Sequence, residues 1–230
     1  MAGGGVVKVY GLAASPFVAT VLVCLEEAGA AYELVPLDMA AREQRAPHHL
    51  ARNPFGKIPA MEDGELTLFE SRAISRYVLR KYRNAAAGGG GGGGGGADLL
   101  REGNLEEAAM VDAWVEAEAH QYEPAAAHIV RQCVFLPMIS GARDQRVVDE
   151  HAGKLREVLR VYDARLGERD YLAGDFVSLA DIAHFGFTQL LMRTEYAPLV
   201  EERANVKAWW ERLSARPAVR KVAALMTMDF

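Results

Sequence analysis

The sequence predicts an α/β domain in which a βαβ unit precedes a ββα unit, followed by an all-α domain. Three observations lead to this fold class. Two short apolar runs, 6–10 and 32–36, flank a helical stretch, and a hairpin signal with a second helical stretch follows at 60–82. Beyond a run of nine consecutive glycines, the patterns are those of helices alone. The chain therefore divides into halves of different character.

Composition excludes several classes of protein. The chain has 230 residues, 50% of them hydrophobic and 25% charged, which is the balance of a globular protein of one large or two small domains. A net charge of −5 argues against a general nucleic-acid surface. No apolar run is long enough to span a membrane, and the first residues lack the pattern of a signal peptide. Cys24 and Cys133 have neither metal nor CxxC spacing, so we expect a cytoplasmic protein with reduced thiols.

The first strand ends in a loop that leads to Ser15 and Pro16. Serine is favoured as a helix N-cap and proline at the first helical position, so a helix over 17–28 is expected to begin here. A helix N-terminus attracts anions through its free N–H groups and its dipole. The Ser15 hydroxyl is therefore placed where an anion such as a thiolate would be held. The simpler alternative is that Ser15 only caps the helix.

The next segments complete the first domain. A right-handed crossover makes the strand at 32–36 parallel to the first strand. The polar stretch 38–53 is expected to be loop with a short helical turn near 48–51. Pro59 interrupts an apolar run and predicts an edge, a bulge or a cis peptide bond. Asp63 and Gly64 are typical of a hairpin turn, and a helix is expected from 71 to 82.

The glycine run marks the domain boundary. Glycines 88–96 have no side chains to bury, so residues 84–103 are interpreted as a flexible linker rather than as a recognition tail. The predicted domains are accordingly 1–83 and 104–230.

The second half is predicted to be helical throughout. Asn104 can cap a helix that runs past Pro124, where a kink is expected. Ser178 and Asp181 resemble a capping box, with aspartate in place of Glu or Gln. The helix that follows, 179–192, is almost wholly apolar and should be the centre of this domain. Further helices are expected at 147–166, 205–214 and 217–224.

The βαβ–ββα order, with a proline before the third strand, is the thioredoxin-like plan. Redox members of that fold place Cys-x-x-Cys at the start of the first helix, where this chain has Ser-Pro-Phe-Val, so disulfide exchange is not expected. Three phrases resemble the plant phi class of cytosolic glutathione transferases: Arg52–Pro59, Leu68–Ile74 and Tyr171–Asp175. The resemblance covers nearly the whole chain apart from the glycine run.

This resemblance implies an enzyme. It would use glutathione as its co-substrate and transfer the glutathione thiolate to hydrophobic electrophiles in detoxification, or reduce organic hydroperoxides with that thiolate. The enzyme would hold no permanent cofactor. The alternative is a non-catalytic carrier of apolar metabolites in a cleft between the domains. The intact Ser15 favours the enzyme, because a carrier does not need the hydroxyl.

The resemblance also implies roles for residues of the glutathione site. Ser15 would hydrogen-bond the sulfur as the catalytic residue, and Ile58, before Pro59, would offer its backbone to the cysteinyl unit. Glu70 would pair with the γ-glutamyl amine and Ser71 with its carboxylate. The family often has His-Lys where this chain has Gln44 and Arg45, and glutamine where it has Lys57. These three positions complete the set, and the cations of Arg45 and Lys57 would meet the glycyl carboxylate.

Other positions have weaker signals. The family's hydrophobic substrate site corresponds here to Leu12, Phe17, His120 and Tyr122. Phe55 matches an aromatic residue that the family inserts into a partner subunit, which implies a homodimer. Tyr10, where other transferase classes place a catalytic tyrosine, is interpreted as packing. Cys24 is expected to be a buried apolar residue.

No metal site is expected. His48 and His49 are interpreted as the solvated start of a helix, because no carboxylate or cysteine falls at ligand spacing.

Overall fold

The computed structural model describes residues 6–83, 98–139 and 141–227. Two compact units divide the chain: residues 1–100 together with 220–230, and residues 101–219. This division assigns the buried Leu99 and Leu100 and the C-terminal residues to the first unit, whereas the sequence predicts a first domain that ends at residue 83. The glycine run of the expected linker lies outside the described residues.

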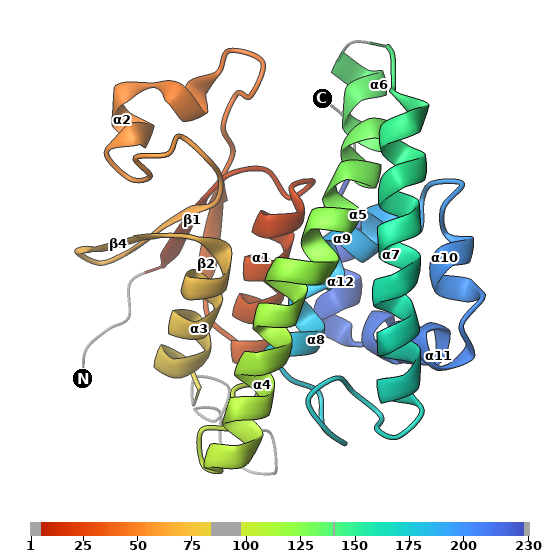
Figure 1. Ribbon diagram of the computed structural model, residues 1–230. Coiled ribbons are helices and arrows are strands. Elements are labelled where there is room, and N and C mark those ends of the chain that lie inside the picture. Colours follow the sequence, from red (N-terminus) through yellow and green to blue (C-terminus); the bar gives the residue numbers. More distant parts are fainter. Residues whose placement is uncertain (1–5, 84–97, 140, 228–230) are drawn as a thin grey trace. The chain divides into compact units, whose positions relative to one another are not determined.

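The first unit is built on a four-stranded mixed sheet of order β2-β1-β3-β4 (Figure 1). β1 and β2 are parallel and are joined through α1, whereas β3 is antiparallel to both β1 and β4. This confirms the predicted βαβ–ββα fold class. The elements, in chain order, are β1 (Val7–Tyr10), α1 (Pro16–Ala28), β2 (Tyr32–Val35), η1 (Glu43–Arg45), α2 (Pro47–Leu50), β3 (Ala60–Asp63), β4 (Leu66–Phe69) and α3 (Ser71–Lys81).

α1 lies beside α3 and forms the centre of this unit (Figure 1). Val18, Ala19 and all residues from Val21 to Leu25 are fully buried, because the helix is apolar on nearly every face. Cys24 belongs to this set, as predicted, and burial raises the pKa of its thiol to about 12. The helix ends at Gly29, whose left-handed backbone (φ 66°) closes the last turn.

Two turn predictions are confirmed in this unit. The Ile58–Pro59 peptide bond is cis, one of the three conformations expected at Pro59. Gly64 has φ 62° in the hairpin between β3 and β4, as its Asp-Gly sequence indicates.

The second unit is helical. Its elements are α4 (Leu105–Ala117), η3 (Glu118–Tyr122), α5 (Glu123–Val130), η4 (Arg131–Phe135), α6 (Leu136–Ile139), α7 (Gln145–Leu166), α8 (Leu179–Ala183), α9 (Phe185–Leu191), α10 (Pro198–Glu201), α11 (Ala204–Ser214) and, crossing into the first unit, α12 (Pro217–Leu225). Asn104 caps α4 by accepting from the N–H groups of Glu106 and Glu107 (3.0 and 3.3 Å). A π-helical segment, η3, precedes Pro124, which lies in the first turn of α5, where a proline is tolerated.

Asp181 does more than the expected cap. Its carboxylate accepts from the Ser178 N–H (2.9 Å) and also from the Leu172 N–H (3.0 Å) and the Trp209 indole (2.9 Å). It is fully buried, and burial raises its pKa against the effect of these donors. The apolar helix expected over 179–192 is interrupted at His184, whose ring Nδ1 bonds the Ala180 carbonyl (2.7 Å). One buried carboxylate thus joins the start of α8 to α11 and to the preceding loop.

Candidate functional site

The register of the sheet brings three loops to one edge. Tyr10, the last residue of β1, pairs with Ala60, the first of β3, and Ala60 pairs with Phe69, the last of β4. Because β3 runs opposite to its two neighbours, the residues after β1, before β3 and after β4 meet at the same edge of the sheet. These residues include Ser15, Ile58, Pro59, Glu70 and Ser71.

Gly11 allows the first two of these loops to approach. A Cβ atom at this position would lie 2.6 Å from Cγ2 of Val18 and 3.3 Å from Cβ of Ile58. Its amide is fixed by the Val35 carbonyl (3.0 Å). Glycine is therefore required where the loop from β1 passes the residue before the cis-proline. Sequence reasoning identified the loop but not this contact.

Ser15 stands at the start of α1 with its side chain uncommitted to the cap. Its backbone is extended (φ −73°, ψ 125°), and its carbonyl accepts the Ala19 N–H (2.9 Å), as at an N-cap. However, its hydroxyl makes no capping hydrogen bond. The first turn of α1 holds no acidic residue, and Pro16 occupies its first position. The hydroxyl is thus left without the hydrogen bond by which a serine N-cap stabilises a helix start.

Glu70 has a backbone conformation that side chains rarely adopt. Its φ is 70° and its ψ 110°, it is exposed, and it immediately precedes α3. Such conformations cost about 1–3 kcal/mol and concentrate at functional sites. The next residue, Ser71, is 7% exposed and opens a helix without an acidic residue in its first turn. This helix start suits a carboxylate ligand.

Three other predicted positions lie on the loops near this edge. The Arg45 guanidinium donates to the Phe55 carbonyl (3.0 Å), and Gly56 passes so close that a Cβ there would lie 2.8 Å from Cδ of Arg45. The Lys57 side chain is exposed. Oε1 of Gln44 is buried and has no hydrogen-bond partner among the described residues. The structure thus anchors Arg45 but leaves the ends of the other two side chains without a defined role.

His49 was wrongly predicted to be solvated. Its side chain is completely buried, and its ring Nε2 bonds the carbonyl of Lys57 (2.9 Å). The Asn53 amide donates to the same oxygen (2.9 Å). His48 is exposed, as expected, and lies 3.2 Å from a Glu43 carboxylate oxygen. Two adjacent histidines in a four-residue helix have no periodicity that would reveal which one faces inward.

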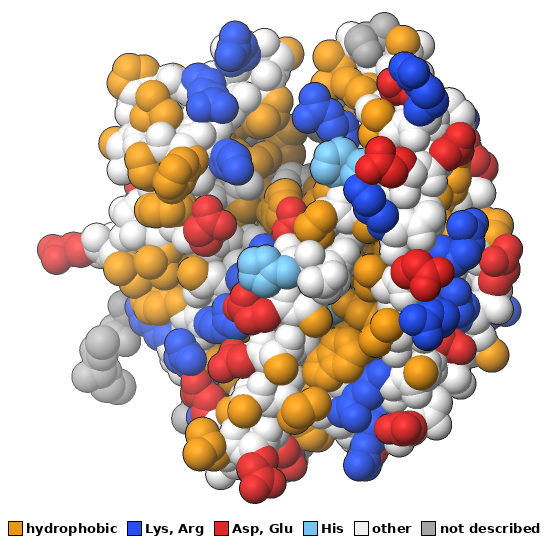
Figure 2. All heavy atoms as spheres, in the orientation of Figure 1, with side chains coloured by type: hydrophobic (Ala, Val, Ile, Leu, Met, Phe, Trp, Pro, Cys, Tyr) orange, Lys and Arg blue, Asp and Glu red, His pale blue; other side chains and the backbone are white. Residues whose placement is uncertain are grey.

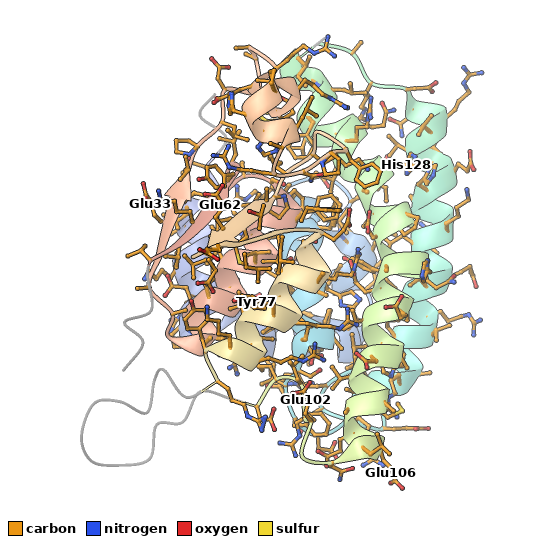
Figure 3. The ribbon with its side chains drawn as sticks, turned by 90° about the vertical axis from the view of Figure 1, so that its left-hand side faces the viewer. Glu33, Glu62, Tyr77, Glu102, Glu106 and His128 are labelled. Atoms are coloured by element: carbon orange, nitrogen blue, oxygen red, sulfur yellow. The ribbon has the colours of Figure 1, made fainter. Side chains whose placement is uncertain are left out.

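Tyr10 has the packing role that the sequence indicated. It is 7% exposed, and its hydroxyl donates to Glu62 (2.7 Å), which also accepts from Arg52 (2.6 Å). The Arg52 guanidinium lies over the tyrosine ring, 4.0 Å from its centroid. Burial, followed by the bond to Glu62, raises the pKa of Tyr10. Glu62 is labelled in Figure 3 on the strand that carries it. The tyrosine hydroxyl is therefore engaged within the unit.

The residues expected to bind an apolar substrate differ in their surroundings. Leu12 and Phe17 are half-buried at the start of the loop and of α1. His120 is exposed in the helical unit, 3.2 Å from Glu116. Tyr122 requires a correction: it is 1% exposed, and its hydroxyl shares a hydrogen bond with Thr188 (2.7 Å). Its ring stacks on Tyr162, and burial raises its pKa. It packs in the interior of the helical unit.

Metal coordination finds no support within the described ranges. No group of three or more His, Cys, Asp or Glu side chains there could hold a metal ion. The face of the chain drawn in Figure 2 mixes acidic, basic and hydrophobic side chains over the helices. Nor is any helix in the described part of the chain long and apolar enough to cross a membrane.

The fold and the site together define a class of protein. A thioredoxin-like unit with a serine at the start of its first helix and a cis-proline before β3, followed by a helical unit, is the architecture of glutathione transferases. Family models for the N-terminal and C-terminal domains of glutathione S-transferase match residues 5–80 and 122–217. The chain belongs to the glutathione S-transferase family, and its relatives are plant phi-class enzymes.

Individual relatives match over nearly their whole length. A probable glutathione S-transferase, GSTF1 of Oryza sativa subsp. japonica, is 56% identical over 96% of both chains. The crystal structure of glutathione transferase F7 from Populus trichocarpa superposes with a TM-score of 0.90 at 47% identity, over 97% of this chain and 100% of that one. Glutathione S-transferase I from maize, in complex with an atrazine glutathione conjugate, has a TM-score of 0.88 at 49% identity, over 98% and 100%. This chain is accordingly an enzyme that uses glutathione as its co-substrate.

Proposed function

We propose that the Ser15 hydroxyl stabilises the thiolate of bound glutathione, which then attacks a hydrophobic electrophile. The observation that carries this proposal is the uncommitted hydroxyl of Ser15 at the start of α1. A free thiol has a pKa of about 8.5, and lowering it to about 7 requires roughly 2 kcal/mol. A hydrogen bond to a charged group supplies about 1.5–3 kcal/mol, and the helix N-terminus adds to it. One hydroxyl is therefore sufficient.

The rest of glutathione is assigned to the loops at the same edge of the sheet. The Ile58 backbone, held beside the cis-proline, would receive the cysteinyl unit as an added strand. Glu70 and Ser71 would bind the γ-glutamyl amine and carboxylate at the start of α3. Arg45 and Lys57 would face the glycyl carboxylate. The strained backbone of Glu70 supports this assignment, because the fold maintains it at a cost.

The second substrate is proposed to be a small apolar electrophile. The half-buried Leu12 and Phe17, on either side of Ser15 in the sequence, would contact it close to the sulfur. Glutathione S-transferase I from maize has been crystallised with an atrazine glutathione conjugate, and a glutathione S-transferase-I with lactoylglutathione, which supports conjugation as the reaction of such a site. Reduction of organic hydroperoxides by the same thiolate is included in the proposal.

A direct assay distinguishes this function from a non-catalytic carrier. Purified protein is mixed with glutathione and a chromogenic aryl halide, and the conjugate is followed by absorbance. Enzymatic turnover that Ser15→Ala reduces supports the proposal. Binding of apolar dyes without any turnover of several electrophiles would favour the carrier.

Phe55 supports a homodimer. Its ring is 59% exposed and packs edge-on against Phe69, with centroids 5.9 Å apart. A large exposed aromatic on a loop is suited to a pocket of a second copy. Sedimentation of the wild type as a dimer, with dissociation in Phe55→Ala, would support this role. A cytoplasmic location is also proposed, on the two free cysteines.

A further inference from the structure

The peptide that precedes Ile58 is held by two side chains from one short segment. His49 and Asn53 are 0% and 2% exposed, and their ring Nε2 and amide Nδ2 each lie 2.9 Å from the Lys57 carbonyl oxygen. With two partners, this carbonyl is fixed in direction toward the interior of the unit.

The direction of that carbonyl determines the direction of the next N–H group. The Lys57–Ile58 peptide bond is trans, and in a planar trans peptide the C=O and N–H bonds point to opposite sides. A carbonyl turned toward His49 and Asn53 therefore turns the Ile58 N–H away from them. Within the described residues this N–H has no hydrogen-bond partner. It is a donor left for a ligand at the open edge of the sheet.

The two donors are themselves fixed by their own segment. The Asn53 N–H bonds the His49 carbonyl (2.9 Å), and Oδ1 of Asn53 accepts from the Phe55 N–H (3.1 Å). The Gly56 N–H bonds the Asn53 carbonyl (2.9 Å). The segment 49–57 thus forms a small hydrogen-bonded frame around the Lys57 carbonyl.

Packing alone does not account for a histidine at this position. Its Nδ1 is buried and has no hydrogen-bond partner in the described part of the chain. An unsatisfied buried acceptor destabilises a fold, so an apolar side chain of similar size would pack at a lower cost. The benefit that offsets this cost is the donor at Nε2.

We propose that His49 is a positioning residue for glutathione. Together with Asn53 it holds the Lys57 carbonyl inward, so that the Ile58 N–H faces the cysteinyl carbonyl of the bound tripeptide. This inference rests on the proposed role of the Ile58 backbone in glutathione binding. It does not involve the Ser15 hydroxyl, so His49 acts on the affinity for glutathione and not on ionisation of its thiol.

The test compares three substitutions at one position. His49→Gln keeps an N–H donor near the place of Nε2, His49→Asn is too short to reach the carbonyl, and His49→Leu removes both nitrogens. We expect His49→Leu and His49→Asn to raise the KM for glutathione and the Kd for S-hexylglutathione by about tenfold, from the loss of one buried hydrogen bond. The kcat should change less than about threefold, and His49→Gln should retain most of the affinity. His48→Gln is the matched control, since that side chain is exposed.

Thermal unfolding separates this role from a structural one. His49→Leu should keep a melting temperature close to that of the wild type while it loses affinity for glutathione. Unchanged affinity in a folded His49→Leu, or equal losses in His49→Gln and His49→Asn, would overturn the inference. If His49→Leu does not fold, the comparison of the Gln and Asn variants decides. Failure of the wild type to bind S-hexylglutathione would instead refute the proposed site itself.

Discussion

Replacing Ser15 by alanine tests the proposed chemistry most directly. The substitution removes one hydroxyl from the start of α1. Because that hydroxyl makes no capping bond, the usual loss of about 1 kcal/mol for an N-cap substitution should not appear, and the melting temperature should be nearly unchanged. Affinity for glutathione should also change little, since the proposed binding groups, which are Glu70, Ser71, Arg45, Lys57 and the Ile58 backbone, are left in place.

The expected effect is confined to the thiol. Loss of a hydrogen bond worth about 1.5–3 kcal/mol corresponds to a rise of about 1–2 units in the pKa of bound glutathione. The same free energy predicts a decrease in turnover of about tenfold to 150-fold near neutral pH. Raising the pH should restore part of the rate, because more of the thiol then ionises without help.

The assay is a pH–rate profile together with ultraviolet absorbance of the thiolate in the bound complex. Tyr10→Phe is the control, since its hydroxyl donates to Glu62 instead. A normal profile in Ser15→Ala combined with a shifted profile in Tyr10→Phe would show that the chain uses the tyrosine, and would refute the role assigned to Ser15.

Three further predictions concern stability. Asp181→Ala should destabilise the protein by about 3 kcal/mol or more in chemical denaturation, because it leaves buried donors unpaired. Loss of a simple cap costs roughly 0.5–2 kcal/mol, so a destabilisation within that range would contradict this prediction. Burial tends to raise the pKa of Asp63, but hydrogen bonds from Lys81, Tyr82 and Tyr77 (labelled in Figure 3) outweigh it and hold that pKa below its usual value. Its stabilising contribution should therefore be complete above the ordinary aspartate pKa of about 4 and be lost as the pH falls below it, so Asp63→Asn should flatten the acid limb of the stability curve. Identical stability curves for the two proteins would exclude this. Tyr10→Phe should lower the free energy of unfolding by about 1 kcal/mol or less, because the Glu62 carboxylate that accepts the lost hydrogen bond is partly exposed. The turnover of this variant should stay within about twofold of the wild type.

Local signals in the sequence were sufficient where a single residue type determines the backbone. Ser15 with Pro16 predicted the start of α1, Asn104 the start of α4, and Asp63 with Gly64 the hairpin, and the structure has all three. Each depends on capping or turn chemistry that acts over two to four residues. The strand positions followed instead from apolar runs, and the register of the strands brought the loops after β1, before β3 and after β4 to one edge of the sheet.

The remaining features depend on contacts that are distant in the sequence. Glu70 has a positive φ at the junction of β4 with α3, and no propensity predicts this conformation for glutamate. Thr20 is buried, and its hydroxyl donates to the Pro16 carbonyl (3.1 Å). Tyr122 was placed in a substrate site by resemblance alone, whereas it is buried and its hydroxyl shares a hydrogen bond with Thr188, 66 residues further along the chain. Such side chains are assigned by tertiary structure.

The starts of α1 and α3 are suited to a negatively charged ligand. At three helices of the second unit, side chains accept the first N–H groups: Asn104 at α4, Asp144 at α7, and Asp163 at α11. α1 and α3 have no such acceptor, since Ser15 and Glu70 give no side-chain cap and neither first turn contains an acidic residue, which is also true of α2 and α9. A helix N-terminus left without an internal acceptor favours a negatively charged ligand. In the proposed site, the thiolate of glutathione would lie at the start of α1 and its γ-glutamyl carboxylate at the start of α3. The substrate would then supply the negative charge that these two helix starts lack.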